Sequence, residues 1–205
     1  MIIFLRHGQA ENNTKKILAG RTPGINLTEQ GKEQAEQAGE MIKSLNISAI
    51  YSSPIDRAMQ TAEIVGKHCD VKPILDDRLI ELDMGKFTMM PYDEIFASHG
   101  NVFLKFYEGS LEISHNGVES FAEVQKRVFD IVDFVKNEHK EENVVLVTHM
   151  DPIKAMIGKV LSLEPEILFQ LIIANASLNI FKYDDQNLYL SSINSMNSSR
   201  FHETF

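Results

Sequence analysis

Two short apolar runs, each leading into a histidine, constrain the fold of this chain more than any other feature. The first run covers residues 2–5 and is followed by Arg6 and His7, and the second covers residues 144–147 and leads through one threonine to His149. Continuous apolar runs of this length are typical of strands that are buried on both faces, as in a parallel sheet covered by helices. The two runs therefore predict neighbouring central strands, each with a histidine at its carboxyl end.

Helical segments alternate with these strands. Thr28 and Glu29 suit the first turn of a helix through about residue 45, and Ser120 with Glu123 forms a capping box that opens a long amphipathic helix. The remaining predicted elements are a strand at 49–52, a helix at 54–67 with Pro54 in its first turn, a short strand near Ile74, a helix at 92–97, and a helix with Asp151 as N-cap and Pro152 as its first residue. This alternation predicts an α/β three-layer sandwich with a mostly parallel central sheet and helices on both faces.

Four further segments complete the predicted architecture. Residues 7–27 read as a long loop of the kind that is usually functional, and residues 98–118 read as an irregular segment that forms a lid. Residues 177–183 and 188–192 are predicted strands at one sheet edge, joined by a turn at 184–187. The polar tail at 194–205 is expected to be loosely held. We expect one domain across residues 1–205.

The charge of the chain limits its partners. There are 20 Lys and Arg against 29 Asp and Glu, which gives a formal net charge of −9. Nucleic acid and anionic membranes both require a basic face, so neither is an expected partner. The start of the chain lacks the pattern of a signal peptide, no apolar run could span a bilayer, and Cys69 is the single cysteine. These features favour a cytoplasmic protein; they give no indication of its oligomeric state.

The strand ends carry the chemistry. Open α/β sheets bind ligands at the carboxyl ends of their strands, where Arg6, His7 and His149 are expected to meet. Arg57 lies in the first turn of the helix that follows the strand at 49–52. Guanidinium forks and a helix N-terminus suit a phosphate dianion, and a neutral histidine can attack phosphorus. Such a site needs no metal and no cofactor, because the arginines and the second histidine neutralise the charge.

Motifs across almost the whole chain resemble those of the histidine phosphatase superfamily, which has the phosphoglycerate-mutase-like fold. No single motif is specific, but their order along the chain is. The motifs are Arg6-His7-Gly8-Gln9 with Asn13, Leu27-Thr28-Glu29-Gln30-Gly31, Ser52-Ser53-Pro54-Ile55-Asp56-Arg57-Ala58 with Thr61-Ala62, Leu79-Ile80-Glu81 with Gly85, Val147-Thr148-His149, and Asn175-Ala176-Ser177.

The resemblance implies a role for each matching residue. His7 is the nucleophile, and Glu81 protonates the leaving oxygen and then activates water, with Asp83 as a less well-spaced alternative. The phosphoryl group is held by Arg6, Arg57 and His149, and the substrate is contacted by Asn13, Arg21 and Met150.

The chain departs from the family pattern at several positions near the expected site. Ala10 replaces a usual Ser or Thr, Met150 replaces a glycine, and Asp151 places a negative charge where an anion is expected. We expect Asp151 to be an N-cap turned away from the ligand. Six side chains either line the pocket or belong to the ordinary core, namely Met84, Met89, Met90, Phe103, Phe106 and Tyr107.

Three functions remain open from the sequence. The first is a metal-independent phosphomonoesterase that acts on a small phosphorylated substrate through a phosphohistidine on His7. The second is a cofactor-dependent phosphoglycerate mutase, but the segment after Glu81 lacks the arginines with which such mutases hold a substrate carboxylate. The third is a non-catalytic phospholigand-binding protein, which would need neither a nucleophile nor an acid.

Overall fold

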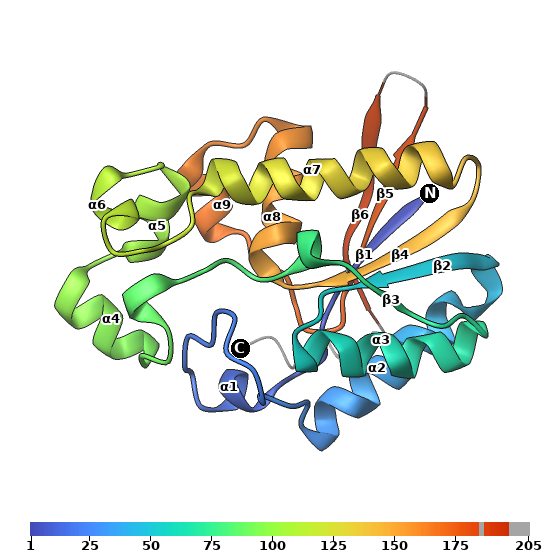
Figure 1. Cartoon of the computed structure of the whole chain (residues 1–205), viewed down its shortest axis with the longest axis horizontal. Coiled ribbons are helices and arrows are strands. Elements are labelled where there is room, and N and C mark those ends of the chain that lie inside the picture. Colours follow the sequence, from blue (N-terminus) through green and yellow to red (C-terminus); the bar gives the residue numbers. More distant parts are fainter. Residues whose placement is uncertain (185–186, 197–205) are drawn as a thin grey trace.

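A six-stranded mixed sheet forms the centre of the protein. The structure is a computed structural model that describes residues 1–184 and 187–196, and its sheet has the strand order β3-β2-β4-β1-β5-β6 (Figure 1). The strands are β1 (Ile2–Arg6), β2 (Ile47–Ser52), β3 (Ile74–Leu75), β4 (Asn143–Thr148), β5 (Leu178–Tyr183) and β6 (Leu188–Ser195). The predicted α/β class, with a mostly parallel sheet between helices, is confirmed.

The register of the central strands sets the position of their ends. β1 and β4 run parallel with Arg6 opposite Thr148, and β4 runs parallel to β2 with Val147 opposite Ser52. The three strands therefore end together at one edge of the sheet. The predicted strands at 177–183 and 188–192 form the β5–β6 hairpin, in which β5 pairs antiparallel with β1 and β6 forms the sheet edge.

Helices cover both faces of the sheet. Side chains alternate along β1, so Ile3 and Leu5 join the core beneath α2 (Glu29–Ile42) and α3 (Asp56–Cys69). Ile2 and Phe4 join the core beneath α7 (Phe121–Glu138) and α8 (Met150–Leu161) on the other face (Figure 1). The other helices are α1 (Glu11–Thr14), α4 (Tyr92–His99), α5 (Val102–Tyr107), α6 (Leu111–Ser114) and α9 (Pro165–Gln170), with 3₁₀ turns η1 (Lys43–Leu45), η2 (Asp77–Leu79) and η3 (Gly85–Phe87).

Local sequence determined some helix starts and not others. The Thr28 side chain accepts a hydrogen bond from Gly31, and Ser120 and Glu123 form the predicted capping box. The starts predicted at Pro54 and Asp151 are wrong. α3 begins at Asp56, and His149 rather than Asp151 is the N-cap of α8, because His149 keeps the extended backbone of the strand it follows. Pro152 is tolerated in the first turn, where its missing N–H group would have no intrahelical acceptor.

Two segments are more ordered than the sequence suggested. The expectation of an irregular segment at 98–118 is wrong, because α5 and α6 lie within it; Asn101 caps α5, whose Val102 and Phe106 are buried. The tail prediction is wrong at its start, since β6 continues to Ser195. The rest of that tail from residue 197, and residues 185–186 of the predicted turn, lie outside the described residues.

Two glycines allow α2 to press against the chain that leaves β1. A methyl group on Gly31 would lie 1.9 Å from the carbonyl oxygen of Gln9, and one on Gly8 would lie 2.3 Å from the carbonyl oxygen of Gly31. The two backbones therefore touch directly beside His7.

No helix in the described part of the chain is long and apolar enough to cross a membrane.

We expect Gly31→Ala to destabilise the protein. In an unconstrained helix this change would raise stability by about 1 kcal/mol, but overpacking against the Gln9 carbonyl costs ~1–3 kcal/mol or more. Urea denaturation measures the difference, with Glu33→Ala on the exposed face of α2 as the control, expected to stay within about 0.5 kcal/mol of the wild type. A Gly31→Ala variant as stable as the wild type would contradict the close contact.

Candidate functional site

The common edge of β1, β2 and β4 holds two histidines and two arginines. Arg6 and His7 follow from β1, His149 from β4, and Arg57 lies in the first turn of α3. His7 and Arg57 are each 2 % exposed, and His149 is fully buried. A pocket opens here, and the residues that line it are Arg6, His7, Asn12, Asn13, Leu18, Ala19, Gly20, Arg57, Glu81, Met84, Tyr92, Phe103, Met150 and Asp151.

The hydrogen bonds of His7 fix its tautomer. Its Nδ1 lies 2.7 Å from the carbonyl oxygen of Gly8, which can only accept, so Nδ1 carries the proton. Its Nε2 accepts a hydrogen bond from Nε of Arg57 at 3.2 Å. Burial and the positive charges of Arg57 and Arg6 hold the pKa of His7 well below 6.5. His7 is therefore a neutral imidazole, and the lone pair on its Nε2 points at the guanidinium of Arg57.

His149 lies beside His7 with a complementary arrangement. The two ring centroids are 5.1 Å apart, and Nε2 of His149 is 2.9 Å from Oγ of Ser53. That hydroxyl accepts a hydrogen bond from the backbone N–H of Ile55, and Nε2 of His149 is the one acceptor among the described residues for its own proton, so it donates that proton to His149. Nδ1 of His149 then carries the ring proton. Burial and the nearby Arg57 hold the pKa of His149 well below 6.5.

Several buried donors of this site have no partner among the described residues. They are Nε of Arg6, Nη1 of Arg57 and Nδ1 of His149. Other atoms of the same guanidiniums are anchored, since Arg6 donates to the carbonyl oxygen of Ile173 and Arg57 donates to that of Gly20 at 2.8 Å. Buried polar groups without a partner are costly and rare. Three of them in one site are suited to the oxygens of an anion.

Glu81 supplies a carboxyl group on another wall of the pocket. Its Oε1 accepts a hydrogen bond from the N–H of Leu82 at 2.9 Å. Burial and the negative charge of Asp151 raise the pKa of Glu81 to about 7, against the opposing effect of Arg57 and Arg6. Asp83, the alternative acid, does not line the pocket, and its Oδ1 accepts from the N–H of Gly85. Glu81 can therefore both release and take up a proton near neutral pH.

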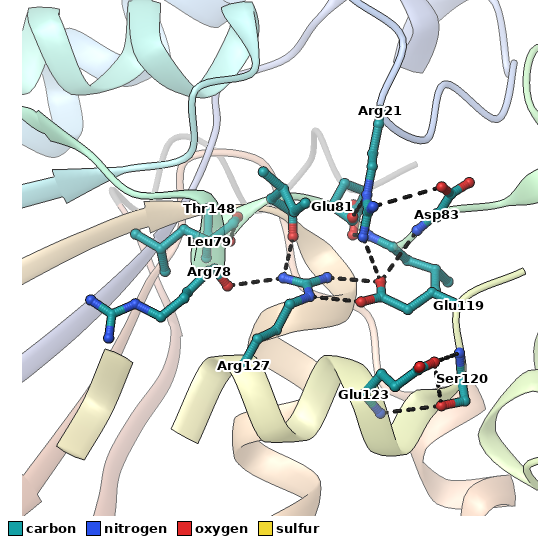
Figure 2. A network of polar contacts seen from close by, with 12 residues as sticks. Arg21, Arg78, Leu79, Glu81, Asp83, Glu119, Ser120, Glu123, Arg127 and Thr148 are labelled. Atoms are coloured by element: carbon teal, nitrogen blue, oxygen red, sulfur yellow. Dashed lines mark hydrogen bonds and ion pairs between the residues drawn. The ribbon is translucent and has the colours of Figure 1, made fainter. Parts of the chain in front are cut away.

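A polar network holds the backbone of the segment that carries Glu81 (Figure 2). Nε of Arg21 donates to the carbonyl oxygen of Glu81 at 2.8 Å, and its Nη2 donates to Glu119 at the same distance. Glu119 also receives two hydrogen bonds from Arg127 of α7, at 2.9 and 3.1 Å. Glu119 thus joins two arginines, one from the long loop and one from α7.

The same network reaches the residues just before Glu81. Nη1 of Arg127 donates to the carbonyl oxygens of Arg78 and Ile80, at 2.9 and 2.6 Å (Figure 2). Oγ1 of Thr148, at the end of β4, donates to the carbonyl oxygen of Leu79 at 2.6 Å. Side chains from three separate elements therefore fix four consecutive carbonyl groups, 78 to 81.

The structure brings together most of the residues singled out from the sequence. Arg6, His7, Asn13, Arg57, Glu81 and Met150 line the pocket. His149 lies behind the lining, next to His7. Arg21 does not line it, because its guanidinium is engaged with Glu81, Glu119 and Asp83. Oδ1 of Asn13 accepts the N–H of Ala10 at 2.9 Å, which orders the turn at the pocket wall.

Other pocket residues were missed or misplaced by sequence reasoning. The expectation that Asp151 turns away from the ligand is wrong, because as the second residue of α8 it lines the pocket. Of the six side chains left open, Met84 and Phe103 line the pocket, whereas Met89, Met90, Phe106 and Tyr107 do not. Glu119 and Arg127 carry no local signal in the sequence. Among the described residues no group of three or more His, Cys, Asp or Glu side chains could hold a metal ion.

Comparison with known families agrees with this geometry. The profile of the histidine phosphatase superfamily (branch 1) matches residues 2–196. The chain therefore belongs to the histidine phosphatase superfamily, as the ordered motifs predicted.

Individual relatives differ in the activity for which they are named. The chain is 35 % identical over 180 residues to a 2,3-bisphosphoglycerate-dependent phosphoglycerate mutase of Thermoplasma acidophilum, covering 87 % of this chain and 84 % of the relative. It is 28 % identical to phosphoserine phosphatase 1 of Hydrogenobacter thermophilus, covering 94 % and 91 %. The solved structure of mycobacterial glucosyl-3-phosphoglycerate phosphatase with VO3 matches with a TM-score of 0.84 at 27 % identity, covering 95 % and 98 %.

The raised pKa of Glu81 predicts a pH-dependent cost in stability. Because this pKa rises from 4.5 to about 7 on folding, the folded protein binds the extra proton between these values. The stabilisation of the folded state by this bound proton is fully present below pH 4.5 and is lost as the pH rises through 7. The unfolding free energy of the wild type should therefore fall by about 2–3 kcal/mol relative to Glu81→Gln between pH 5 and pH 8.

Urea denaturation at both pH values measures this change, and the exposed Glu33→Gln is the control for the rest of the molecule. A difference between wild type and Glu81→Gln that stays constant across this range would refute the burial of a protonated Glu81.

Proposed function

We propose that this protein is a metal-independent phosphomonoesterase that transfers the phosphoryl group of a small substrate to His7 and then to water. The observation that carries the proposal is the state of His7. It is a neutral imidazole in a buried site, with its lone pair on Nε2 directed among arginine donors. The unpaired donors of Arg6, Arg57 and His149 supply hydrogen bonds for the phosphoryl oxygens.

In the first step Nε2 of His7 attacks phosphorus as the bond to the leaving oxygen breaks. The N–H of Arg57 gives up its bond to Nε2 and turns to a phosphoryl oxygen. Glu81 donates its proton to the leaving oxygen, because an alkoxide is too basic to leave unaided. With a pKa of about 7, the protonated and ionised forms of Glu81 are both well populated at neutral pH. The alcohol leaves neutral, and His7 carries the phosphoryl group.

In the second step water attacks the phosphohistidine. Glu81, now a carboxylate, takes one proton from the water, and the oxygen forms its bond to phosphorus as the bond to Nε2 breaks. Inorganic phosphate is released, His7 returns to its neutral form, and Glu81 is protonated again. Arg6 and Arg57 hold the phosphoryl oxygens in both steps, so the residues present complete the cycle.

The pocket favours hydrolysis over a mutase reaction. A phosphoglycerate mutase has to hold the carboxylate of its substrate as well as the phosphate. Arg6 and Arg57 are the only arginines in the described pocket lining, which contains no lysine, and both lie beside His7. A pure binding protein is disfavoured because it gains nothing from a carboxyl group that titrates near pH 7.

We also propose that the protein acts in the cytoplasm, and that the segment 98–118, which contributes Phe103, covers the pocket.

Turnover of p-nitrophenyl phosphate in the presence of EDTA tests the proposed function. We expect hydrolysis by the wild type, acid-labile phosphate on the protein after an acid quench, and loss of both in His7→Ala with folding preserved. An assay with 3-phosphoglycerate and a bisphosphoglycerate primer should give much slower isomerisation than hydrolysis. Full activity of His7→Ala would end the phosphohistidine mechanism, and fast isomerisation would favour the mutase.

Arg21 acts in this scheme as a positioning residue. Its contact with the Glu81 carbonyl holds the acid, while its neighbour Gly20 accepts a hydrogen bond from Arg57. One stretch of the long loop thus fixes the acid on one side of the phosphorus and a phosphate-binding cation on the other.

We expect Arg21→Ala to lower kcat/KM for alkyl phosphates by about 10- to 100-fold and for p-nitrophenyl phosphate much less, because kcat/KM reports the first step, in which only a basic leaving group needs the proton. Glu81→Gln sets the upper limit, ~100- to 10,000-fold on alkyl phosphates, with a burst of nitrophenol as phosphoenzyme accumulates.

The matched control is Arg78→Ala, on the same segment. Arg78 forms an ion pair with Asp76, and its carbonyl oxygen, which Arg127 holds, is kept in the variant. Equal losses of kcat/KM on both substrates in Arg21→Ala would mean that Arg21 does not position the acid.

A further inference from the structure

The pocket has a charge pattern that the proposed phosphoryl chemistry does not use. Beyond the phosphate-binding end, the described lining is aromatic and aliphatic, with Leu18, Met84, Tyr92, Phe103 and Met150. The charged side chains on this part of the lining are the carboxyl groups of Glu81 and Asp151. The leaving group of the substrate therefore meets carboxylates and aromatic rings, while the cations of the lining, Arg6 and Arg57, lie at the phosphate-binding end beside His7.

Asp151 is held in place within the wall. It is 6 % exposed, and its Oδ1 accepts a hydrogen bond from the hydroxyl of Tyr107 at 2.6 Å. Among the described residues no ion pair includes Asp151, and Tyr107 is its one side-chain donor. A carboxylate that is buried, oriented and without a paired cation is suited to a cationic ligand.

The buried ammonium group of Lys154 forms no ion pair with this carboxylate. Lys154, one turn further along α8, is 3 % exposed, and its Nζ lies over the Tyr107 ring, 5.0 Å from the centroid. Burial lowers the pKa of Lys154 to about 8, against the attraction of Asp151. Lys154 does not line the pocket and forms no ion pair with a described residue. A ligand in the pocket therefore meets Asp151 and not Lys154.

We propose that Asp151, together with the Tyr92 and Phe103 rings, binds a cationic nitrogen on the leaving alcohol of the substrate. The substrate class is then phosphomonoesters of amino alcohols or quaternary ammonium alcohols. Carboxylates and aromatic faces both attract cations, and they do so more strongly where water is excluded. A leaving group that carries only a carboxylate is repelled, and one that carries both charges, as in phosphoserine, falls between. This inference rests on the proposed hydrolysis, and it adds no chemical step.

The test compares phosphocholine with 3,3-dimethylbutyl phosphate, which has the same shape without the positive charge. In the wild type we expect kcat/KM for phosphocholine to exceed that for the neutral ester by about tenfold or more, as cation–carboxylate and cation–π contacts of this kind provide. In Asp151→Asn that ratio should fall close to the intrinsic ratio of the two esters. Asp151→Glu, which keeps the charge, should retain most of the preference.

The ratio of two substrates separates this role from an effect on the acid. Asp151 also raises the pKa of Glu81, so its loss changes the rate with every alkyl phosphate, but that change cancels in the ratio. Asp93→Asn is the matched control, because Asp93 follows Tyr92 in sequence, is exposed and does not line the pocket. Its ratio should equal that of the wild type. In a second pair, the wild type should prefer glycerol 3-phosphate to 3-phosphoglycerate, whose carboxylate Asp151 repels. Asp151→Asn removes this repulsion and should reduce that preference.

The outcomes distinguish this inference from the function on which it rests. If the wild type does not hydrolyse p-nitrophenyl phosphate, the proposed function fails. If it does, but treats phosphocholine and its neutral analogue alike, or if Asp151→Asn leaves their ratio unchanged, the substrate inference is overturned and the hydrolase stands. The order of substrates in the wild type decides the question even if the variant does not fold.

Discussion

The parallel pairing of β1 and β4 is the constraint on which the rest of the structure depends. Its register sets Arg6 opposite Thr148, and it places His7 and His149 side by side beyond the strand ends. The pairing is secured by burial on both faces, because each strand contributes side chains to the cores under α2 and α3 and under α7 and α8. A slip of one residue would exchange the two faces and separate the histidines.

The electrostatics of the site follow from burying both signs of charge in one place. Burial and the neighbouring arginines keep His7 neutral, so its lone pair is available. The same burial, with Asp151 nearby, keeps a proton on Glu81 near neutral pH. In the proposed mechanism these are the protonation states that the nucleophile and the acid need before a substrate arrives. The cost appears as buried donors without partners, which an anion can satisfy.

The position of Glu81 depends on residues far apart in the sequence. Four carbonyl groups before and at Glu81 are held by Arg127, Thr148 and Arg21, and Glu119 ties the two arginines together (Figure 2). Backbone carbonyls accept such bonds whatever side chain they carry, so side chains from outside fix this segment, whose only regular structure is the 3₁₀ turn η2.

The sequence by itself determined the fold class and the centre of the site. Apolar runs that end in histidine, a capping box and a set of ordered motifs are local signals, and each depends on neighbouring residues that stay neighbours in the fold. The positions of Arg6, His7, Arg57 and Glu81 in one pocket followed from them.

Only the tertiary structure decided which way Asp151 and Arg21 face. Asp151 enters the pocket because α8 begins two residues earlier than its local sequence suggests, while β4 still holds His149 in extended backbone. Arg21 turns to Glu81 and Glu119 because residues 60 and 98 positions away supply its acceptors. Contacts at such separations leave no pattern in the chain, since their geometry exists only after the sheet and α7 have packed together.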